Sequence, residues 1–413
     1  MSVPKSSWMR EIYVNGLGGT TPLASTTYEL LRAKAQEVLE PKAYAYVAGS
    51  AGSEETEASN QSALRDWQIV PRMLAGVDLA QFDSSVTLFG RRFPTPLVVS
   101  PIGVQAQLHK DCDVATASAA RELGIPFTLS SATSTPMEQV ITGAGYDEEG
   151  DEGQEAWFQL YWPSDDDITR SLLARAKKAG YKVLVVTLDT WSLGWRPRDL
   201  DAAYNPFLHG EGVANCFSDP VFVEKYCEGK SPLRKDASAD DTQAASIAAI
   251  GLLTPGISRA WADLALLREL WGDAPIILKG IQALSDAQRA VEAGMDGIWV
   301  SNHGARQVGG ACGALQALRP IAQYARSQGK TVIFDSGVRT GADVIKALAL
   351  GAHAVGVGRP YAWGLAVGGE EGVAEVLKGL LADFELTAGL SGHRSLADIG
   401  AHSLIRRGEE ARL

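Results

Sequence analysis

Short apolar segments recur along the chain from residue 97 onward, and amphipathic stretches separate them. There are eight, at 97–102, 125–130, 157–161, 182–189, 275–280, 297–303, 331–336 and 353–358. Their residues are apolar on both faces of an extended chain, which is typical of strands buried in a parallel sheet. The pattern therefore predicts eight parallel strands with helices between them.

The intervening stretches carry residues that begin and end helices. Residues 164–167 (Ser-Asp-Asp-Asp) supply a cap and first-turn acids, and Gly180 follows a basic last turn. Residues 285–294 and 341–351 repeat this scheme. Eight strand–helix units in series favour a closed (β/α)8 TIM barrel, with a doubly wound open sheet as the alternative.

A chain of 413 residues suits one barrel domain with insertions. We expect a helical preface at 1–96, the barrel at 97–380, and a C-terminal helix and tail at 381–413. The prediction is therefore a single domain.

Two insertions interrupt the repeating pattern. The acidic segment 146–156 precedes the third strand, so we expect a solvated loop on the bottom face of the barrel. Residues 190–258 follow the fourth strand and lie on the top face, where barrel active sites form. A connection this long is usually a lid, and its polar, alanine-rich middle, 236–249, is expected to be its most mobile part.

Composition narrows the class of protein. Hydrophobic residues at 46% and charged residues at 21% are ordinary for a soluble enzyme, and the net charge of −11 argues against nucleic acid. The four cysteines have no metal-type spacing, which indicates reduced thiols. We expect no secretory signal and no membrane span. The last residues, Ala411-Arg412-Leu413, are of the kind that directs peroxisomal import, so we expect a cytoplasmic or peroxisomal protein.

Polar groups capable of chemistry gather at the carboxyl ends of the predicted strands. Asp189 ends the fourth strand, Lys279 lies at the end of the fifth, and His303 ends the sixth. An isolated histidine is more often a core residue. Here a strand-end carboxylate such as Asp189 can orient the imidazole and stabilise its charged form, which indicates a general base.

Two arginines, Arg196 and Arg306, fall on top-face loops. Solvation at the surface is the ordinary state of an arginine. A paired role as a carboxylate clamp is favoured here, because guanidinium groups grip carboxylates with two hydrogen bonds and stay charged.

The loops after the last two strands predict a phosphate site. Barrels commonly bind phosphate there with glycine amides, and Gly337, Arg339, Gly358 and Arg359 supply open backbone and positive charge. The chain has neither a Walker A sequence nor a strand followed by GxGxxG, which argues against a nicotinamide-type site.

These residues, in this order, resemble the FMN-dependent L-2-hydroxy-acid oxidase family. Residues 301–307 read Ser-Asn-His-Gly-Ala-Arg-Gln and match the family signature SNHG[AG]RQ. The resemblance extends from 11–13 to 383–386 and looks closest to lactate 2-monooxygenase. The segments that carry this narrower likeness are 46–49, 187–191, 194–200, 219–222, 278–282 and 358–364.

The resemblance implies a role for each matching residue of the substrate site. His303 is the base and Asp189 its partner. The substrate carboxylate is held by three residues, Tyr46, Arg196 and Arg306. Tyr161 meets the substrate hydroxyl or keto oxygen, and Lys279 stabilises the reduced flavin.

The same resemblance implies FMN as the cofactor and a set of contacts to it. Those near the ring are Pro101, Ile102, Gly103, Ser130, Gln159, Thr187, Lys279 and Ser301. Those at the ribityl chain and phosphate are Asp335, Gly337, Arg339, Gly358 and Arg359. Relatives assemble as homotetramers or homo-octamers, so we expect a homo-oligomer.

One position departs from the family. Glycolate oxidase has a tryptophan, and lactate 2-monooxygenase a leucine, where this chain has Ala132. That position lines the pocket for the substrate side chain, so a small residue makes room for an acid larger than lactate.

The leading hypothesis is lactate 2-monooxygenase, which converts L-lactate and O2 to acetate, CO2 and water. The alternative is an L-2-hydroxy-acid oxidase that releases the 2-oxo acid and H2O2, with a larger substrate. A non-catalytic FMN- or phosphate-binding barrel is disfavoured, because binding FMN alone requires neither the base nor the paired arginines. The sequence does not separate hydride transfer from a carbanion route.

Overall fold

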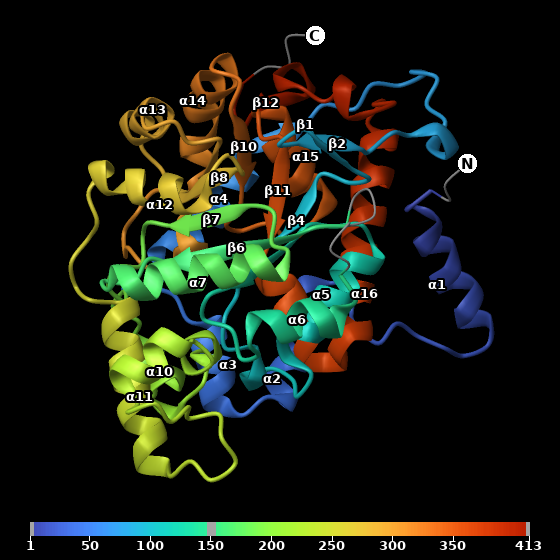
Figure 1. Ribbon diagram of the computed structural model, residues 1–413. Helices are drawn as coiled ribbons and strands as arrows, with labels where there is room; N and C mark the ends of the chain where they lie inside the picture. Colours follow the sequence, from blue (N-terminus) through green and yellow to red (C-terminus); the bar gives the residue numbers. More distant parts are fainter. Residues whose placement is uncertain (1–3, 147–153, 410–413) are drawn as a thin grey trace.

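Eight parallel strands close into a barrel in the computed structural model, which describes residues 4–146 and 154–409 (Figure 1). Around the barrel the strands follow the order β10-β11-β4-β5-β6-β7-β8-β9. They are β4 Leu97–Val99, β5 Phe127–Ser130, β6 Ala156–Tyr161, β7 Leu184–Thr187, β8 Ile276–Ile281, β9 Gly297–Val300, β10 Thr331–Phe334 and β11 Ala354–Val357. The predicted TIM barrel is confirmed.

The predicted strands correspond one to one with the observed strands, but most of the observed strands are shorter. The segment expected at 297–303, for example, leaves the sheet after Val300 and turns into a short 3-10 helix, η5 His303–Ala305. The residues that no longer pair in the sheet are the polar ones at the ends of the predicted strands. Their side chains are therefore free to face the top of the barrel rather than its core.

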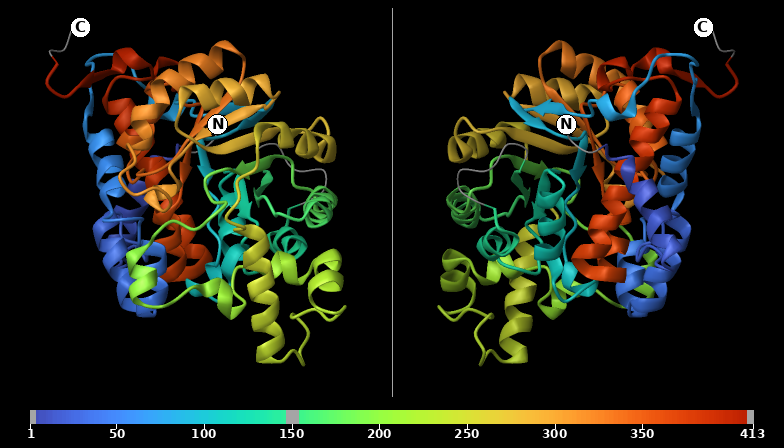
Figure 2. Two further views of the ribbon diagram at one scale, coloured as in Figure 1. Left: turned by 90° about the vertical axis from the view of Figure 1, so that its left-hand side faces the viewer. Right: turned by 90° about the vertical axis from the view of Figure 1, so that its right-hand side faces the viewer.

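Helices pack around the outside of the barrel (Figures 1 and 2). They are α5 Cys112–Glu122, α6 Met137–Ala144, α7 Asp166–Ala179, α12 Leu264–Trp271, α13 Leu284–Glu292, α14 Ala314–Ser327, α15 Gly341–Ala349 and α16 Arg359–Leu390. α7 begins as its sequence indicates, because the Asp165 carboxylate accepts hydrogen bonds from the amides of Asp167 and Ile168. It ends at Gly180, whose φ of 100° is left-handed.

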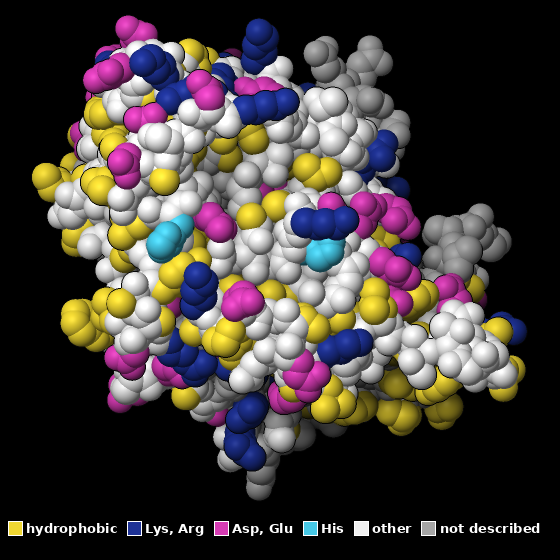
Figure 3. Space-filling model, turned by 90° about the horizontal axis from the view of Figure 1, so that it is seen from below, with side chains coloured by type: hydrophobic (Ala, Val, Ile, Leu, Met, Phe, Trp, Pro, Cys, Tyr) yellow, Lys and Arg dark blue, Asp and Glu magenta, His cyan; other side chains and the backbone are white. Residues whose placement is uncertain are grey.

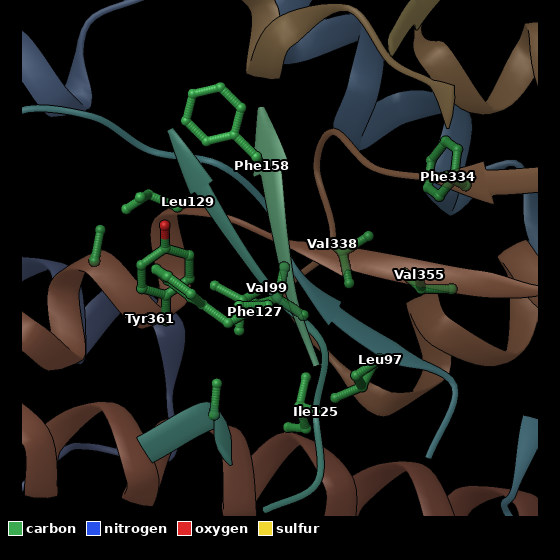
Figure 4. Close-up of a cluster of buried hydrophobic side chains, with 14 of the residues drawn as sticks. Leu97, Val99, Ile125, Phe127, Leu129, Phe158, Phe334, Val338, Val355 and Tyr361 are labelled. Carbon is green, nitrogen blue, oxygen red and sulfur yellow. The ribbon is translucent and has the colours of Figure 1, made fainter. Parts of the chain in front are cut away.

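The core lies between the strands and these helices. Figure 4 shows part of it, where Val99, Phe127 and Leu129 from neighbouring strands approach Tyr361 at the start of α16. A second cluster fills the bottom of the barrel interior around Trp157 and Trp299.

The N-terminal preface is helical, as expected, but it also contains strands. Its helices are α1 Ser7–Leu17, α2 Tyr28–Val38, α3 Pro41–Ala48 and α4 Glu55–Arg65, followed by the turn η1 Leu79–Gln81. β1 Trp67–Ile69 pairs with β12 Leu404–Arg406 near the other end of the chain, and β2 Val86–Leu88 pairs with β3 Arg91–Phe93. Leu88 and Phe93 from this hairpin are buried against Trp157, so the hairpin plugs the bottom of the barrel.

The connection after β7 is largely helical rather than irregular. It contains α8 Pro197–Asp201, η3 Pro206–His209, α9 Ala214–Phe217, α10 Pro220–Tyr226 and α11 Ala239–Leu253, and η4 Trp261–Asp263 follows it. The alanine-rich middle that we expected to be most mobile forms most of α11. Alanine favours helix, Ser238 caps the first turn, and Ala245, Ala249 and Leu253 are buried.

A partly buried polar network connects the centre of this connection to the barrel helices. The Arg175 guanidinium of α7 donates to the carboxylates of Glu138 and Asp219 and to the carbonyl of Asn215. Asp219 is fully buried and also accepts the amides of Val221 and Phe222, so it caps α10.

The C-terminal boundary also differs from the expected one. α16 starts at Arg359 and runs to Leu390 with a break at Gly368 and Gly369, so the expected boundary at 380 falls inside a helix. The short turns η6 Leu396–Asp398 and η7 Ala401–Ser403 follow.

Two expectations concern residues outside the described part of the chain. They are the acidic loop, most of which falls at 147–153, and the C-terminal tripeptide at 411–413. Within the described residues, none of the helices has the length and apolarity that crossing a bilayer requires.

Replacing Asp219 with alanine should lower the free energy of unfolding by about 3 kcal/mol, because it uncaps α10 and leaves Arg175 short of a buried partner. Chemical denaturation followed by circular dichroism measures this change. Asp167→Ala is the control, because it removes an exposed pair with Lys225. Equal losses in both variants would show that the network does not anchor the lid.

Candidate active site

One cavity gathers most of the predicted site residues at the carboxyl ends of the strands. The preface, the strand-end loops and the lid all contribute to its lining. The predicted residues that line it are Tyr46, Pro101, Ile102, Gly103, Ala132, Tyr161, Arg196, Lys279, His303, Arg306, Asp335, Gly337, Arg339, Gly358 and Arg359. Asp189, Ser130, Gln159, Thr187 and Ser301 are not part of this lining.

His303 sits on a strained turn directly after β9. Its φ is 59°, and Gly304 and Ala305 are also left-handed. For His303 and Ala305, which carry a Cβ, this conformation is unfavourable unless the surroundings hold it. Asn302 accepts the amide of Ala305, and its side chain exchanges two hydrogen bonds with Asn60 of α4. The preface therefore holds the turn that presents the imidazole.

The imidazole of His303 has one nitrogen on a carboxylate and the other toward the cavity. Nδ1 lies 2.9 Å from Oδ1 of Asp189, and Nε2 lies 3.4 Å from the Tyr161 hydroxyl. Thr190 donates to the same Asp189 oxygen. This network assigns the proton to Nδ1, which leaves Nε2 able to accept one.

Burial and the ion pair shift both pKa values. Burial lowers the pKa of His303, and the Asp189 carboxylate offsets part of that effect. Burial alone would raise the pKa of Asp189, but His303 and Lys279 outweigh it and the net pKa is lowered. At neutral pH the arrangement is a carboxylate beside a neutral imidazole, which is the resting form of a general base.

The two arginines of the predicted clamp lie side by side. Arg196 is 5% exposed and donates to the carbonyl of Arg306 and to the side chain of Gln307. Arg306 donates to the carbonyls of Tyr46 and Gly49. Burial and the neighbouring Arg196 lower the pKa of Arg306 to about 9. Two like charges held this close leave room for an anion to stabilise both.

Gln307 ties the loop of Arg196 to the loop of His303. Its amide donates to the carbonyls of Asp189 and Ser192. Gly194 is required in this packing, because a Cβ there would lie 2.5 Å from the carbonyl oxygen of Arg306. The loops after β7 and β9 are therefore packed closely together and joined by hydrogen bonds.

Lys279 is a buried cation at the end of β8. It is 3% exposed, and its Nζ lies 3.1 Å from Ser301 Oγ and 3.4 Å from Asp335 Oδ2. A β-bulge between Lys279 and Ile281 shifts the register of this strand against β9. The ammonium group is thus held in the cavity wall between β8, β9 and β10.

The residues predicted to hold a phosphate come together in the loops after β10 and β11, which we call the phosphate end. Gly337 has a φ of 95°, and Gly358 is the residue before the first turn of α16. Arg359 donates to the carbonyls of Val47, Gly49 and Gly304. Arg339 pairs with Glu57, and its guanidinium carbon lies 4.1 Å from the centre of the Tyr28 ring. Open backbone at a helix N-terminus with two guanidinium groups suits a phosphate.

The predicted ring contacts that do not line the cavity form a buried chain below it. Ser130 donates to Gln159, and Gln159 donates to Thr187. These side chains come from β5, β6 and β7, and they are at most 6% exposed. Ser301 accepts the His303 amide, so it supports the base from behind.

The charges of the lining fit FMN and a carboxylate substrate together. Five cationic side chains and two carboxylates line the cavity, a surplus of three positive charges. A phosphate carries nearly two negative charges and a substrate carboxylate carries one. Among the described residues, no group of three or more His, Cys, Asp or Glu could hold a metal ion.

Several lining residues were not anticipated from the sequence. Thr190 directly follows Asp189, and its position beside a strand-end carboxylate was a usable signal. Glu57 and Asn60 lie on α4, whose sequence gives no sign of a functional site. Ile250 and Leu253 of the lid also line the cavity, and nothing in the sequence placed them there.

Comparison with known proteins identifies the family. Residues 35–406 match the family model for FMN-dependent dehydrogenase. The chain is 46% identical to the FMN-dependent alpha-hydroxy acid dehydrogenase qulF of Penicillium citrinum, covering 97% of this chain and 96% of the relative. It is 35% identical to 4-hydroxymandelate oxidase of Amycolatopsis orientalis, covering 89% and 94%.

A solved structure agrees. Mandelate oxidase with (S)-4-hydroxymandelic acid superposes with a TM-score of 0.77 at 33% identity, covering 92% of this chain and 98% of that one. These relatives are dehydrogenases and oxidases, so they do not support the narrower likeness to lactate 2-monooxygenase. The chain belongs to the FMN-dependent α-hydroxy acid dehydrogenase and oxidase family, and it is an enzyme that oxidises an α-hydroxy acid with FMN as its cofactor.

Proposed function

We propose that the enzyme oxidises an L-2-hydroxy acid with an apolar side chain larger than methyl, and releases the 2-oxo acid together with H2O2. The observation that carries the proposal is the apolar part of the cavity beside Ala132. Val104, Phe207, Ile250 and Leu253 line the same cavity as this alanine. Apolar walls with a small residue among them favour an apolar group of some size.

Two relatives support this choice of substrate class. 4-Hydroxymandelate oxidase and mandelate oxidase are named for acids with an aromatic side chain. Release of the oxo acid is the simpler outcome, and both of these relatives are named oxidases. The leading hypothesis from the sequence was lactate 2-monooxygenase chemistry. The product assay described below distinguishes that reaction from release of the 2-oxo acid.

The proposed mechanism begins with the carboxylate. Arg196 and Arg306 bind it, and the side chain of Tyr46 lies over the Arg306 guanidinium at 4.9 Å. Burial raises the pKa of Tyr161, so its hydroxyl stays neutral and donates a hydrogen bond to the substrate oxygen. These contacts fix the hydroxyl-bearing carbon in front of His303.

His303 then accepts the proton at Nε2, and Asp189 stabilises the imidazolium through Nδ1. When bound, FMN would supply the acceptor for the two electrons of the oxidation, with O2 as the final oxidant. Lys279 would face the ring from β8, and Arg339, Arg359 and the start of α16 would hold the phosphate. The buried chain from Ser130 to Thr187 would support the floor under the ring.

We also propose that preface, barrel and lid form one functional unit. Tyr46 and Glu57 come from the preface, and Phe207 and Leu253 come from the lid, yet all line one cavity with the strand ends. No single segment would hold the substrate by itself.

The proposed reaction is tested by the products. Purified enzyme incubated in air with a panel of L-2-hydroxy acids, from lactate to 4-hydroxymandelate, should prefer the larger acids. It should form one 2-oxo acid and one H2O2 per O2 consumed. An acid shortened by one carbon, together with CO2 and without H2O2, would establish the monooxygenase reaction instead.

Replacing Ala132 with tryptophan should lower kcat/KM for aromatic acids by roughly tenfold to a hundredfold, because the indole fills the side-chain pocket. The value for lactate should change much less. Ala132→Ser is the matched control, because it adds only one atom. A uniform loss over all acids would mean that the residue does not select the side chain.

Replacing His303 with glutamine should leave an FMN-loaded protein that substrate reduces at least roughly a hundredfold more slowly.

In the native enzyme, burial lowers the pKa of His303 below its ordinary 6.5, and only the neutral form accepts a proton. We therefore expect kcat/KM to stay level as pH falls to 6.5 and to decline only below it. Stopped-flow bleaching of the flavin measures the rate of reduction in the variant and the pH dependence in the native enzyme. Fast bleaching of the His303→Gln variant would remove His303 from the mechanism.

A further inference from the structure

We propose that Glu57 is the resident counter-ion of the phosphate end: it neutralises Arg339 in the apoprotein and shares that arginine with the FMN phosphate when the cofactor binds. The proposal rests on the cofactor and is independent of the substrate proposed above. It assigns to α4 a role in how tightly, and how reversibly, the cofactor is held.

The position of Glu57 is fixed on both carboxylate oxygens. Oε1 lies 3.1 Å from Nη2 of Arg339, and Oε2 accepts a hydrogen bond of 2.7 Å from Ser50. The side chains of Glu57 and Arg339 are each 18% exposed, and Ser50 is fully buried. Glu57 is thus a held carboxylate in the cavity wall, not a mobile surface group.

No other carboxylate among the described residues that line the cavity is placed to act as this counter-ion. The two carboxylates that line the cavity are Glu57 and Asp335, and Asp335 pairs with Lys279. Arg359, the other cation of the phosphate end, bonds to carbonyl oxygens and to the Ser50 hydroxyl, which carry no charge. Glu57 is therefore the one negative group among the lining residues that a phosphate would meet there.

Glu57 is ionised in this setting. Burial alone would raise its pKa, but Arg359, the Ser50 hydrogen bond and Arg339 together lower it. An ionised carboxylate beside a phosphate dianion repels it, and this repulsion is poorly screened in a partly buried site.

Arg339 cannot simply turn toward the phosphate and away from everything else. Its guanidinium stacks on the Tyr28 ring, and the Tyr28 hydroxyl accepts a hydrogen bond from Trp363 of α16. The stacked arginine stays in place while its charge is shared between the carboxylate and the arriving phosphate. The Glu57 carboxylate lowers the repulsion among the cavity cations before FMN binds, and it weakens the hold on phosphate afterwards.

The test compares FMN with riboflavin, which lacks the phosphate, on apoprotein of Glu57→Gln. Quenching of flavin fluorescence gives both dissociation constants. We expect the dissociation constant of FMN to fall roughly fivefold to tenfold, because the substitution removes one partly buried repulsion between carboxylate and phosphate. The dissociation constant of riboflavin should stay the same. The thermal midpoint of the apoprotein should fall, because its cations lose their partner.

Glu55→Gln is the matched control: it lies two residues away on the same helix, is exposed, and changes the net charge by the same amount. It should leave both constants unchanged. Should the apoprotein of Glu57→Gln prove unstable, release of FMN from the purified holoenzyme replaces the titration, and release should be slower than in the native protein. Unchanged or weaker FMN binding, faster release, or an equal change for riboflavin would overturn the proposal.

Discussion

The hydrogen bond between His303 and Asp189 joins two residues 114 positions apart, and it forms because the parallel sheet brings the carboxyl ends of β7 and β9 to the same face. β7 and β9 are not neighbours in the sheet; β8 lies between them. The two side chains meet above the strand ends, where the loops lean inward. Everything that positions the imidazole, from the strained turn at 303–305 to the Asn60 side chain behind it, supports this one contact.

Around that pair the protein concentrates positive charge. Outside, basic and acidic side chains are interspersed on the face seen from below in Figure 3, although the whole chain carries a net charge of −11. The positive surplus is therefore a property of the cavity interior. Placing five buried or half-buried cations around one cavity is costly. The structure offsets the cost with carbonyl oxygens at Arg306 and Arg359 and with carboxylates at Lys279 and Arg339. The remaining charge is available to phosphate and substrate.

The lid divides into a fixed part and a part that shapes the pocket. The Arg175 network ties α9 and α10 to α6 and α7 through hydrogen bonds to Glu138, Asn215 and Asp219. α11 instead places Ile250 and Leu253 at the cavity. α11 thus contributes to the cavity wall although its sequence is mostly alanine and small polar residues.

The sequence by itself determined the barrel and most of the active-site chemistry. Eight apolar segments with polar ends are enough to predict parallel strands whose carboxyl ends carry His303, Asp189, Lys279 and the two phosphate loops, because strand polarity in a barrel puts all those ends on one face. Only the tertiary structure decided which side chains outside the strands reach that face. Glu57 and Leu253 lie on helices whose patterns report which residues are buried but not what they are buried against. The alanine-rich middle of the lid forms α11 for a similar reason: alanine is compatible with both a mobile segment and a helix, and packing decides between them.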